Sequence, residues 1–314
     1  MPAPPTVELD AQYRLLREEV GIVPREDRAL LVVRGSEGAE FLEGQLTNAI
    51  EALEPGAGCY AALLDRKGKM RAEGRVLRIA DDLIWVEPGA DTVDEVLRHL
   101  DTYRIGRDAE VERRESAGML SLIGPRAAEL IGVPLGAEHA HRELRIAERD
   151  AVLVTTDVGA DLIAEHDDLD AIAAELETGG AEPVAAEAAE ILRVERGRPR
   201  FGAEMGNETI PQEAGINERA VSFEKGCYIG QETVARLHYK GKPNRQLRRL
   251  TSEQVLEAGA AVRVGEREVG SIGTAVLSPA RGPLALAILR REAEPGAEVL
   301  VGDEHRAVVE EIED

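Results

Sequence analysis

The sequence predicts an α+β protein made of two related units of strands and helices, followed by a small antiparallel β-barrel. Three observations lead to this prediction. Extended and helical patterns alternate over about the first 110 residues, the same order of elements recurs over residues 111–240, and short strands separated by Gly and Pro follow. We therefore predict one region over 1–240, divided into about 1–110 and 111–240, and a barrel over 241–314.

The first unit reads as a strand and a helix followed by an antiparallel meander. The apolar run at 30–33 ends at Gly35 and Ser36, and apolar residues then recur at helical spacing. Two short polar turns, at 65–69 and 81–82, separate the next strands. The predicted elements are strands over 30–33, 60–64, 76–79 and 83–86 and helices over 39–46 and 93–100.

The second unit repeats this order. Gly124, Pro125 and Arg126 open its first helix, with proline suited to the first helical turn. The predicted elements are strands over 119–123, 151–156 and 161–164, helices over 124–130, 169–176 and 185–196, and barrel strands over 262–265, 268–273, 284–289, 298–301 and 307–309.

The net charge excludes several classes of function. The chain has 60 Asp and Glu against 38 Lys and Arg, a formal charge of −22, which disfavours general binding to nucleic acid or to anionic membranes. Nine aromatic residues (Trp 1, Tyr 5, Phe 3) provide few stacking platforms for single-stranded RNA. The start at 1–6 lacks the pattern of a signal peptide, and no run of about 18 apolar residues occurs, so we expect a cytoplasmic protein with no membrane partner.

Histidine and cysteine usage disfavours a metal site within this chain. The two cysteines, Cys59 and Cys227, are too few for a disulfide scaffold or a four-thiolate cluster. The six histidines show no HExxH spacing, and His139 and His141 fall in a predicted loop, so we interpret them as surface residues. Cys59 has no adjacent cation in the sequence and is predicted to be structural.

The segment 223–236 carries the densest chemistry. Cys227 lies between Gly226 and Gly230, which permit close approach of the backbone to a ligand or a turn with positive φ. A helix is predicted to begin after Gly230, and Lys225 is two residues from the thiol. Both features favour the thiolate, so Cys227 is a candidate reactive or metal-donating residue. The alternative is a buried structural cysteine between apolar neighbours.

A basic stretch follows this segment and contrasts with the acidic chain. It contains no acidic residue, and its basic residues are Arg236, Lys240, Lys242, Arg245, Arg248 and Arg249. Such a patch suits a small polyanion, for example a polyglutamate tail or a few phosphates. The alternative is a solvated strand face that balances acidic neighbours.

The segment from Lys225 to Glu232, with the sequence KGCYIGQE, resembles the signature of the YgfZ folate-binding proteins, which are relatives of the glycine-cleavage aminomethyltransferase. The supporting similarities lie at 41–48, 68–70, 193–199, 210–215 and 269–287. The resemblance implies a GcvT-like fold with two related α+β domains around a central folate channel and a C-terminal barrel. It also implies bound tetrahydrofolate and a role in maintaining iron–sulfur enzymes and thereby tRNA modification.

The candidate site follows from this signature and from the basic stretch. We expect Cys227 to be the working group, acting together with an iron–sulfur protein or its assembly machinery, because the chain cannot hold a cluster alone. The candidate residues are Cys227 and Lys225 as catalytic groups and Tyr228, Gly226, Gly230, Gln231, Glu232, Arg236, Arg245 and Glu195 as cofactor-binding groups.

Departures from the aminomethyltransferase pattern rank the alternatives. Those enzymes carry Asp-Asp-Leu soon after a Gly-Gly turn, where this chain has 70–74, and Asp81 and Asp82 fall in a later turn. They also place an aromatic residue and Glu near the pterin ring, whereas 159–164 has neither an aromatic residue nor a carboxylate after Asp161. A folate-binding accessory protein is thus preferred over a one-carbon transferase of the T-protein type. Direct tRNA binding through 236–249 ranks third.

Overall fold

The computed structural model describes residues 8–312, so the start at 1–6 lies outside the described residues. The chain divides into two compact units. Of the described residues, the first unit contains 8–63, 71–189 and 219–229, and the second contains 64–70, 190–218 and 230–312. The predicted boundary at residue 240 falls between a helix that ends at Lys240 and a strand that begins at Arg245.

One five-stranded sheet of the first unit has the order β3-β4-β5-β2-β6. The predicted meander is confirmed, since β3, β4 and β5 are neighbours in this order and β4 pairs antiparallel with β5, with Val76 opposite Val86. Strand β2 also pairs antiparallel with β5, with Val32 opposite Trp85. The strands are β2 (Leu31–Arg34), β3 (Gly58–Leu64), β4 (Met70–Ala80), β5 (Leu83–Pro88) and β6 (Glu110–Arg113). Asp81 and Asp82 form the turn between β4 and β5, as predicted.

The second sheet of this unit has six strands in the order β11-β1-β7-β10-β9-β8. Its β8-β9-β10-β7 portion repeats the β3-β4-β5-β2 portion, and in both sheets a short antiparallel strand from the other part of the chain flanks the fourth strand. The predicted repeat is therefore confirmed. The strands are β1 (Gly21–Pro24), β7 (Ala117–Ile123), β8 (His141–Ile146), β9 (Arg149–Thr156), β10 (Gly159–Glu165) and β11 (Glu182–Pro183).

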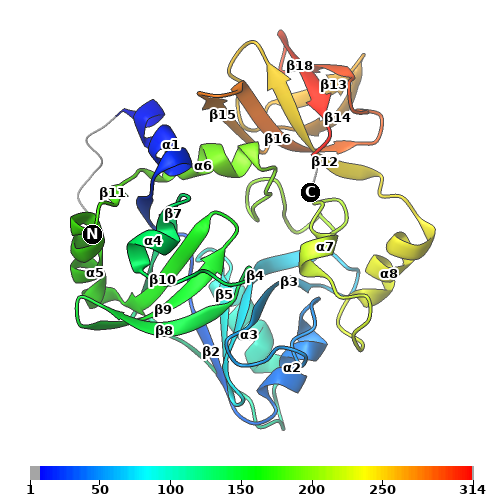
Figure 1. Ribbon diagram of the computed structural model, residues 1–314. Helices are drawn as coiled ribbons and strands as arrows, with labels where there is room; N and C mark the ends of the chain where they lie inside the picture. The colour runs from blue at the N-terminus through cyan, green and yellow to red at the C-terminus, as the bar shows by residue number, and fades with distance from the viewer. Residues whose placement is uncertain (1–7, 313–314) are drawn as a thin grey trace. The chain divides into compact units, whose positions relative to one another are not determined.

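Helices cover the outer face of each sheet, and the inner faces pack on each other. One buried cluster joins the five-stranded sheet to α2 and α3, a second joins the six-stranded sheet to α4 and α5, and a third lies between the two sheets. The first unit is therefore a four-layer α-β-β-α arrangement, and most of its helices and strands are labelled in Figure 1. The helices are α1 (Leu9–Glu18), α2 (Gly38–Gln45), α3 (Val93–Tyr103), α4 (Ala127–Ile131) and α5 (Leu169–Thr178), with a 3₁₀ turn, η1 (His166–Asp168), before α5.

The second unit is dominated by one curled antiparallel sheet in the order β14-β13-β17-β18-β12-β16-β15. After β14 the chain returns to β16, where the Gly273 amide donates to the Leu286 carbonyl at 2.9 Å, so the sheet forms a partly closed barrel. Its strands are β12 (Arg245–Ser252), β13 (Ala261–Val264), β14 (Arg267–Ser271), β15 (Thr274–Ser278), β16 (Gly282–Arg290), β17 (Glu298–Val301) and β18 (His305–Glu310).

Helices α6 (Ala186–Glu195), α7 (Asn217–Ala220) and α8 (Gln231–Lys240) lie in the segments before the barrel. The helix predicted to begin after Gly230 is confirmed as α8. Within residues 8–312, no helix is long and apolar enough to cross a membrane.

Candidate functional site

The space between the two sheets of the first unit has an apolar half and a charged half. Alternation along β4 directs Ala72 and Val76 toward the helices and Glu73, Arg75 and Leu77 toward the opposite sheet. We call the apolar half the cluster Leu30, Val32, Leu77, Trp85, Met119, Val152, Val154 and Ile163. We call the charged half the group Arg25, Asp27, Arg28, Tyr60, Glu73, Arg75, Glu87, Ser121 and Asp161.

Arg75 joins the two sheets at the centre of the charged half. Its Nε donates to Glu87 Oε2 at 2.9 Å, and its Nη1 lies 2.5 Å from Asp161 Oδ2 on the other sheet. Arg75, Glu87 and Asp161 are only 8%, 2% and 3% exposed. The ion pairs are therefore removed from water, where loss of one partner leaves an uncompensated buried charge.

The buried carboxylates respond differently to this environment. Burial raises the pKa of Glu87 although Arg75 and Arg28 oppose the shift. Burial also acts to raise the pKa of Asp161, but Arg75, Arg25 and the Ser121 hydroxyl outweigh it and hold that pKa below its usual range. Asp161 is therefore the more firmly ionised carboxylate of the two.

Glu73 and Tyr60 form the other part of the charged half. Arg28 Nη1 lies 3.2 Å from Glu73 Oε1. Burial raises the pKa of the Tyr60 hydroxyl, and the nearby Glu73 carboxylate acts in the same direction. The Arg219 guanidinium carbon lies 5.4 Å from the centre of the Tyr60 ring. An aromatic ring and a carboxylate thus lie side by side on β3 and β4, although the expected pair is absent from 159–164.

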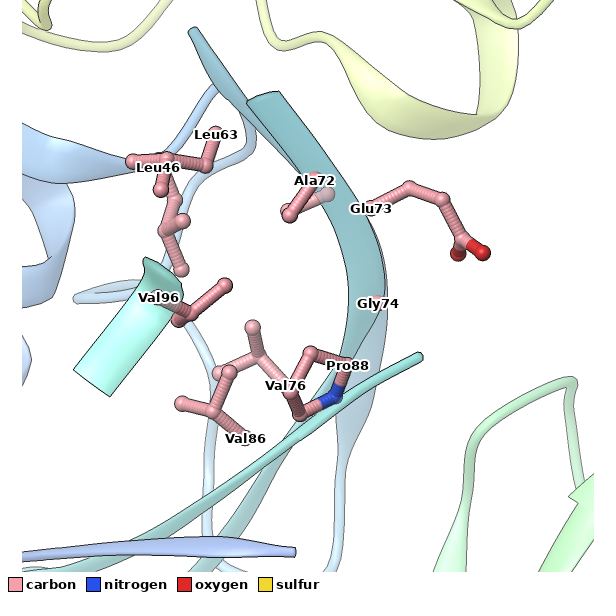
Figure 2. Close-up of a pocket in the computed structure, with 10 residues that line it drawn as sticks. Leu46, Leu63, Ala72, Glu73, Gly74, Val76, Val86, Pro88 and Val96 are labelled. Carbon is pink, nitrogen blue, oxygen red and sulfur yellow. The ribbon is translucent and has the colours of Figure 1, made fainter. Parts of the chain in front are cut away.

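A small cavity lies on the face of β4 that is turned toward the helices. It is lined mainly by apolar residues, including Leu46, Val76 and Val96, and its volume of about 10 Å³ is at the lower limit for one water. Figure 2 shows the Glu73 carboxylate pointing away from these apolar side chains. The cavity is therefore core packing, and the polar chemistry belongs to the opposite face of β4.

Lys225 anchors the cysteine loop, which we define as residues 221–229. Its ammonium group donates to the carbonyls of Glu43, Leu46 and Asn48 at 2.6, 2.8 and 2.7 Å. These bonds use all three ammonium donors. Burial lowers the lysine pKa, opposed by Glu43, whose Oε1 lies 3.6 Å away. These contacts give Lys225 a positioning role, and its catalytic role stays a prediction.

Further hydrogen bonds join the cysteine loop and the residues just before it to the segment 41–48. Thr47 Oγ1 donates to the Ala220 carbonyl at 2.6 Å, and the Ser222 amide donates to the Thr47 carbonyl at 3.0 Å. The Ile229 amide donates to the Gly44 carbonyl at 3.3 Å. Two motifs that are about 180 residues apart in the sequence are thereby fixed together.

Tyr228 and Cys227 have opposite environments within this loop. Tyr228 is 7% exposed, its ring centre lies 5.2 Å from Lys225 Nζ, and burial raises its pKa to about 12. Cys227 and Gly226 are exposed, and a Cβ added at Gly226 would meet nothing within 4 Å. The loop therefore presents its thiol to the surface from a rigidly held base.

Cys59 lies close to the cysteine loop in the fold. The sequence places no cation next to it, but in the fold Lys225 from the cysteine loop interacts with its sulfur. Burial nevertheless dominates and raises the pKa of the Cys59 thiol to about 12, with Lys225 opposing the shift. The thiol is thus protonated at neutral pH, which agrees with the structural role predicted for Cys59.

The signature continues into the second unit at Gly230. Its φ of +84° is the left-handed conformation that favours glycine. A Cβ there would lie 2.5 Å from the Asp65 carbonyl oxygen and 3.0 Å from the Gly68 Cα, so only glycine fits against this turn. Gln231 and Glu232 lie in the first turn of α8, where the negative charge of Glu232 interacts favourably with the positive end of the helix dipole.

Three arginines of the basic stretch are already engaged in the second unit. Arg245 makes two bonds of 2.9 Å to Glu213, Arg249 pairs with Glu310 at 2.9 Å, and Arg248 donates to the Gln246 side chain. Arg236, Lys240 and Lys242 are exposed. The balancing of acidic neighbours therefore describes Arg245 and Arg249 better than a free polyanion site does, and Arg248 is held by a neutral side chain.

Glu195 also lies among contacts of the second unit. The Ser278 hydroxyl donates to its carboxylate, and Arg249 Nη1 donates to its main-chain carbonyl at 2.8 Å. These contacts fix the end of α6 on the barrel. A cofactor-binding role for Glu195, Arg236 and Arg245 stays a prediction.

The surface interpretation of the histidines is wrong for His139, which is 9% exposed. The predicted loop around His141 is likewise wrong in part, since β8 begins at that residue. The sequence of this strand, His-Arg-Glu-Leu-Arg-Ile, is mostly polar, so it lacks the apolar run or alternation by which a strand is predicted. Over the described range, no group of three or more His, Cys, Asp and Glu side chains could hold a metal ion.

Comparison with known proteins assigns the fold of this chain. The model of the GCVT N-terminal domain matches residues 6–225. The solved aminomethyltransferase T of the glycine cleavage system from Bartonella henselae superposes with a TM-score of 0.89, covering 99% of this chain and 91% of that one at 22% identity. The fold is therefore that of the GcvT-like proteins.

Relatives with similar sequences identify the family within this fold class. The tRNA-modifying protein YgfZ of Sodalis glossinidius is 30% identical, over 79% of this chain and 75% of the relative. An aminomethyltransferase of Corynebacterium aurimucosum is 27% identical, over 92% of this chain and 84% of the relative. With the KGCYIGQE segment, these matches show that the chain belongs to the YgfZ family of the GcvT-like superfamily.

Proposed function

We propose that this chain is a folate-binding accessory protein for iron–sulfur cluster assembly or repair that indirectly supports tRNA modification, with tetrahydrofolate held at the charged half. The observation that carries the folate proposal is the Tyr60 and Glu73 pair between the two sheets. A pterin needs a ring to stack on and a carboxylate that accepts from its donor edge.

The charged half also has the polarity that such a ligand requires. Glu73 is 6% exposed and is held by Arg28, so its carboxylate is fixed before a ligand arrives. A preorganised acceptor costs little to order on binding. The neighbouring arginines compensate the buried negative charge. Without them a buried carboxylate would become protonated and could no longer accept from a ligand as an anion.

Calorimetric titration with tetrahydrofolate under anaerobic conditions tests the folate proposal. We expect Glu73→Gln to weaken binding by about tenfold to a hundredfold, since a hydrogen bond to a charged group contributes about 1.5–3 kcal/mol. Glu112→Gln is the matched control, because this residue pairs with Arg34 at a site where both side chains are more than half exposed. Absence of binding by the unaltered protein would refute the proposal.

Cys227 is the second part of the proposal. It lies at the surface on an anchored loop, and among the described residues it belongs to no group of three or more His, Cys, Asp and Glu side chains that could hold a metal ion. We therefore propose that the thiol contributes one ligand or one thiol step together with an iron–sulfur protein or its assembly machinery. The remaining ligands would then come from the partner protein, which is why a single exposed cysteine is sufficient.

Complementation of a strain deleted for its own YgfZ tests this role, with tRNA modification as the readout. We expect Cys227→Ala to abolish complementation and Cys59→Ala to retain it, provided that both variants accumulate to the unaltered level. Full rescue by Cys227→Ala would remove the proposed role of the thiol while leaving folate binding unaffected.

A folate-dependent one-carbon transferase of the T-protein type is the alternative function. The similarity to the Corynebacterium aurimucosum aminomethyltransferase favours it, and the KGCYIGQE segment favours the accessory role. Incubation with methylenetetrahydrofolate and an aminomethyl-carrier protein separates the two. Consumption of the folate would establish the transferase, and its absence would support the accessory protein.

A further inference from the structure

His139 has an unusual backbone conformation next to the charged half. It lies between α4 and β8 with φ of +68°, a region that non-glycine residues rarely adopt and that costs on the order of 1–3 kcal/mol. The loop is nevertheless fixed, because the His139 amide donates to the Thr155 carbonyl at 2.8 Å. Such a conformation persists where the surroundings hold a side chain in a required place.

The His139 ring carries a buried nitrogen without a partner. Among the described residues, none forms a hydrogen bond with His139 Nδ1. The residue is only 9% exposed, so the nitrogen is also shielded from water. Leaving a buried polar atom unpaired costs about 1–3 kcal/mol. An unpaired nitrogen on a strained residue therefore indicates that something not belonging to the chain completes the contact.

The charges around the ring connect it to the charged half. Arg75 and Arg219 act on the imidazole, and Arg219 pairs with Glu138 while lying over Tyr60. Burial lowers the pKa of His139 to about 4, opposed by Glu138, so the ring is neutral near pH 7. Its other nitrogen, Nε2, lies 3.8 Å from Glu138 Oε1.

The neighbouring carboxylate determines which nitrogen holds the proton. A negative charge beside Nε2 favours the tautomer with the proton on Nε2, which leaves the lone pair on Nδ1. The group that meets Nδ1 must then be an N–H or O–H donor. Tetrahydropterins carry ring N–H groups at N5 and N8, and fully oxidised pterins lack both.

We propose that His139 Nδ1 accepts a hydrogen bond from a ring N–H of a reduced pterin bound at the charged half, and so selects tetrahydrofolate over folic acid. This inference rests on the proposed folate-binding function. His139 is then a specificity-determining residue, since a buried acceptor disfavours an analogue that cannot donate to it.

The test compares tetrahydrofolate with folic acid in anaerobic titrations of three proteins. We expect the unaltered protein to prefer tetrahydrofolate, and His139→Phe to reduce that preference about tenfold, the effect of losing one hydrogen bond. His139→Asn should retain much of the preference, because asparagine tolerates positive φ and its carbonyl can accept. Circular dichroism must show the native spectrum for each variant.

The outcomes separate this inference from the proposed function. Binding of both folates with equal affinity by the unaltered protein, or an unchanged preference in native His139→Phe, would overturn the inference and leave folate binding in place. Binding of neither folate would overturn both.

A direct readout uses the ¹⁵N signal of the imidazole. We expect the His139 Nδ1 resonance to move when tetrahydrofolate is added and to stay in place with folic acid. An Nδ1 resonance that stays in place with saturating tetrahydrofolate would overturn the inference.

Discussion

The apolar half and the charged half of the space between the two sheets are lined by the same strands but filled by different chemistry. On β4, Leu77 belongs to the apolar half and Arg75, two residues earlier on the same face, to the charged half. Arg75 Nη2 even lies 3.6 Å from Met119 Sδ, where the halves meet. Replacing a buried ion pair by well-packed apolar residues is often neutral or stabilising, so packing alone does not require the charges of this half.

The largest expected effect is on the charged half itself. Arg75→Met should lower the free energy of unfolding by about 3–5 kcal/mol, because Glu87 and Asp161 lose their shared partner while still buried. Urea denaturation followed by circular dichroism measures the change. A loss below 1 kcal/mol would mean that water already reaches these carboxylates.

Removing bulk from the apolar half should separate stability from ligand binding. Leu77→Ala is expected to cost about 2–4 kcal/mol, since the side chain is 0% exposed and leaves a cavity. Tetrahydrofolate affinity should change by less than about threefold, because the substitution removes no polar contact. An affinity loss equal to that of Glu73→Gln would contradict the division into two halves.

Acid should lower the free energy of unfolding through His139, which lies next to the charged half. Its pKa of about 4 in the folded chain lies below the unfolded value of 6.5, so the unfolded chain binds more protons between these values. Stability is thus complete above about pH 6.5 and is lost as the pH falls toward 4, by on the order of 2–3 kcal/mol. Urea denaturation at pH 7 and 4.5 should show a smaller acid loss in His139→Asn. Equal losses would contradict the assignment.

The smallest effect is expected from a pair outside both halves. Arg306 and Glu298 form an ion pair on β18 and β17 with exposed side chains. Arg306→Ala should change the free energy of unfolding by about 0–1 kcal/mol, because solvent screens the pair. A loss as large as that of Arg75→Met would show that burial does not explain the difference between the two regions.

The predicted repeat shows which strands can be recognised from the local sequence pattern alone. The strands at 60–64, 83–86 and 151–156 were found because apolar residues alternate or run continuously between turn residues. Strands β6 and β8 were missed because they are short or mostly polar, and their backbone pairing comes from neighbours elsewhere in the chain. Tertiary contacts decide such strands.

The cysteine loop shows the same limit for the site. The KGCYIGQE segment identified the family, and the glycine needed at 230 follows from its φ of +84°. The sequence placed Lys225 beside Cys227, whereas the fold directs its ammonium to three carbonyls about 180 residues earlier. Proximity in sequence does not determine what a long flexible side chain contacts.

The sequence by itself determined the repeated α+β pattern, the barrel and the signature around Cys227, because each depends on local periodicity or on neighbouring residues. The charged half was decided by the tertiary structure. Glu73, Arg75 and Asp161 look like ordinary polar positions in their strands, and only the face-to-face packing of two sheets buries them together. Burial changes the cost of a charge from nearly nothing to several kcal/mol, and no local pattern records that change.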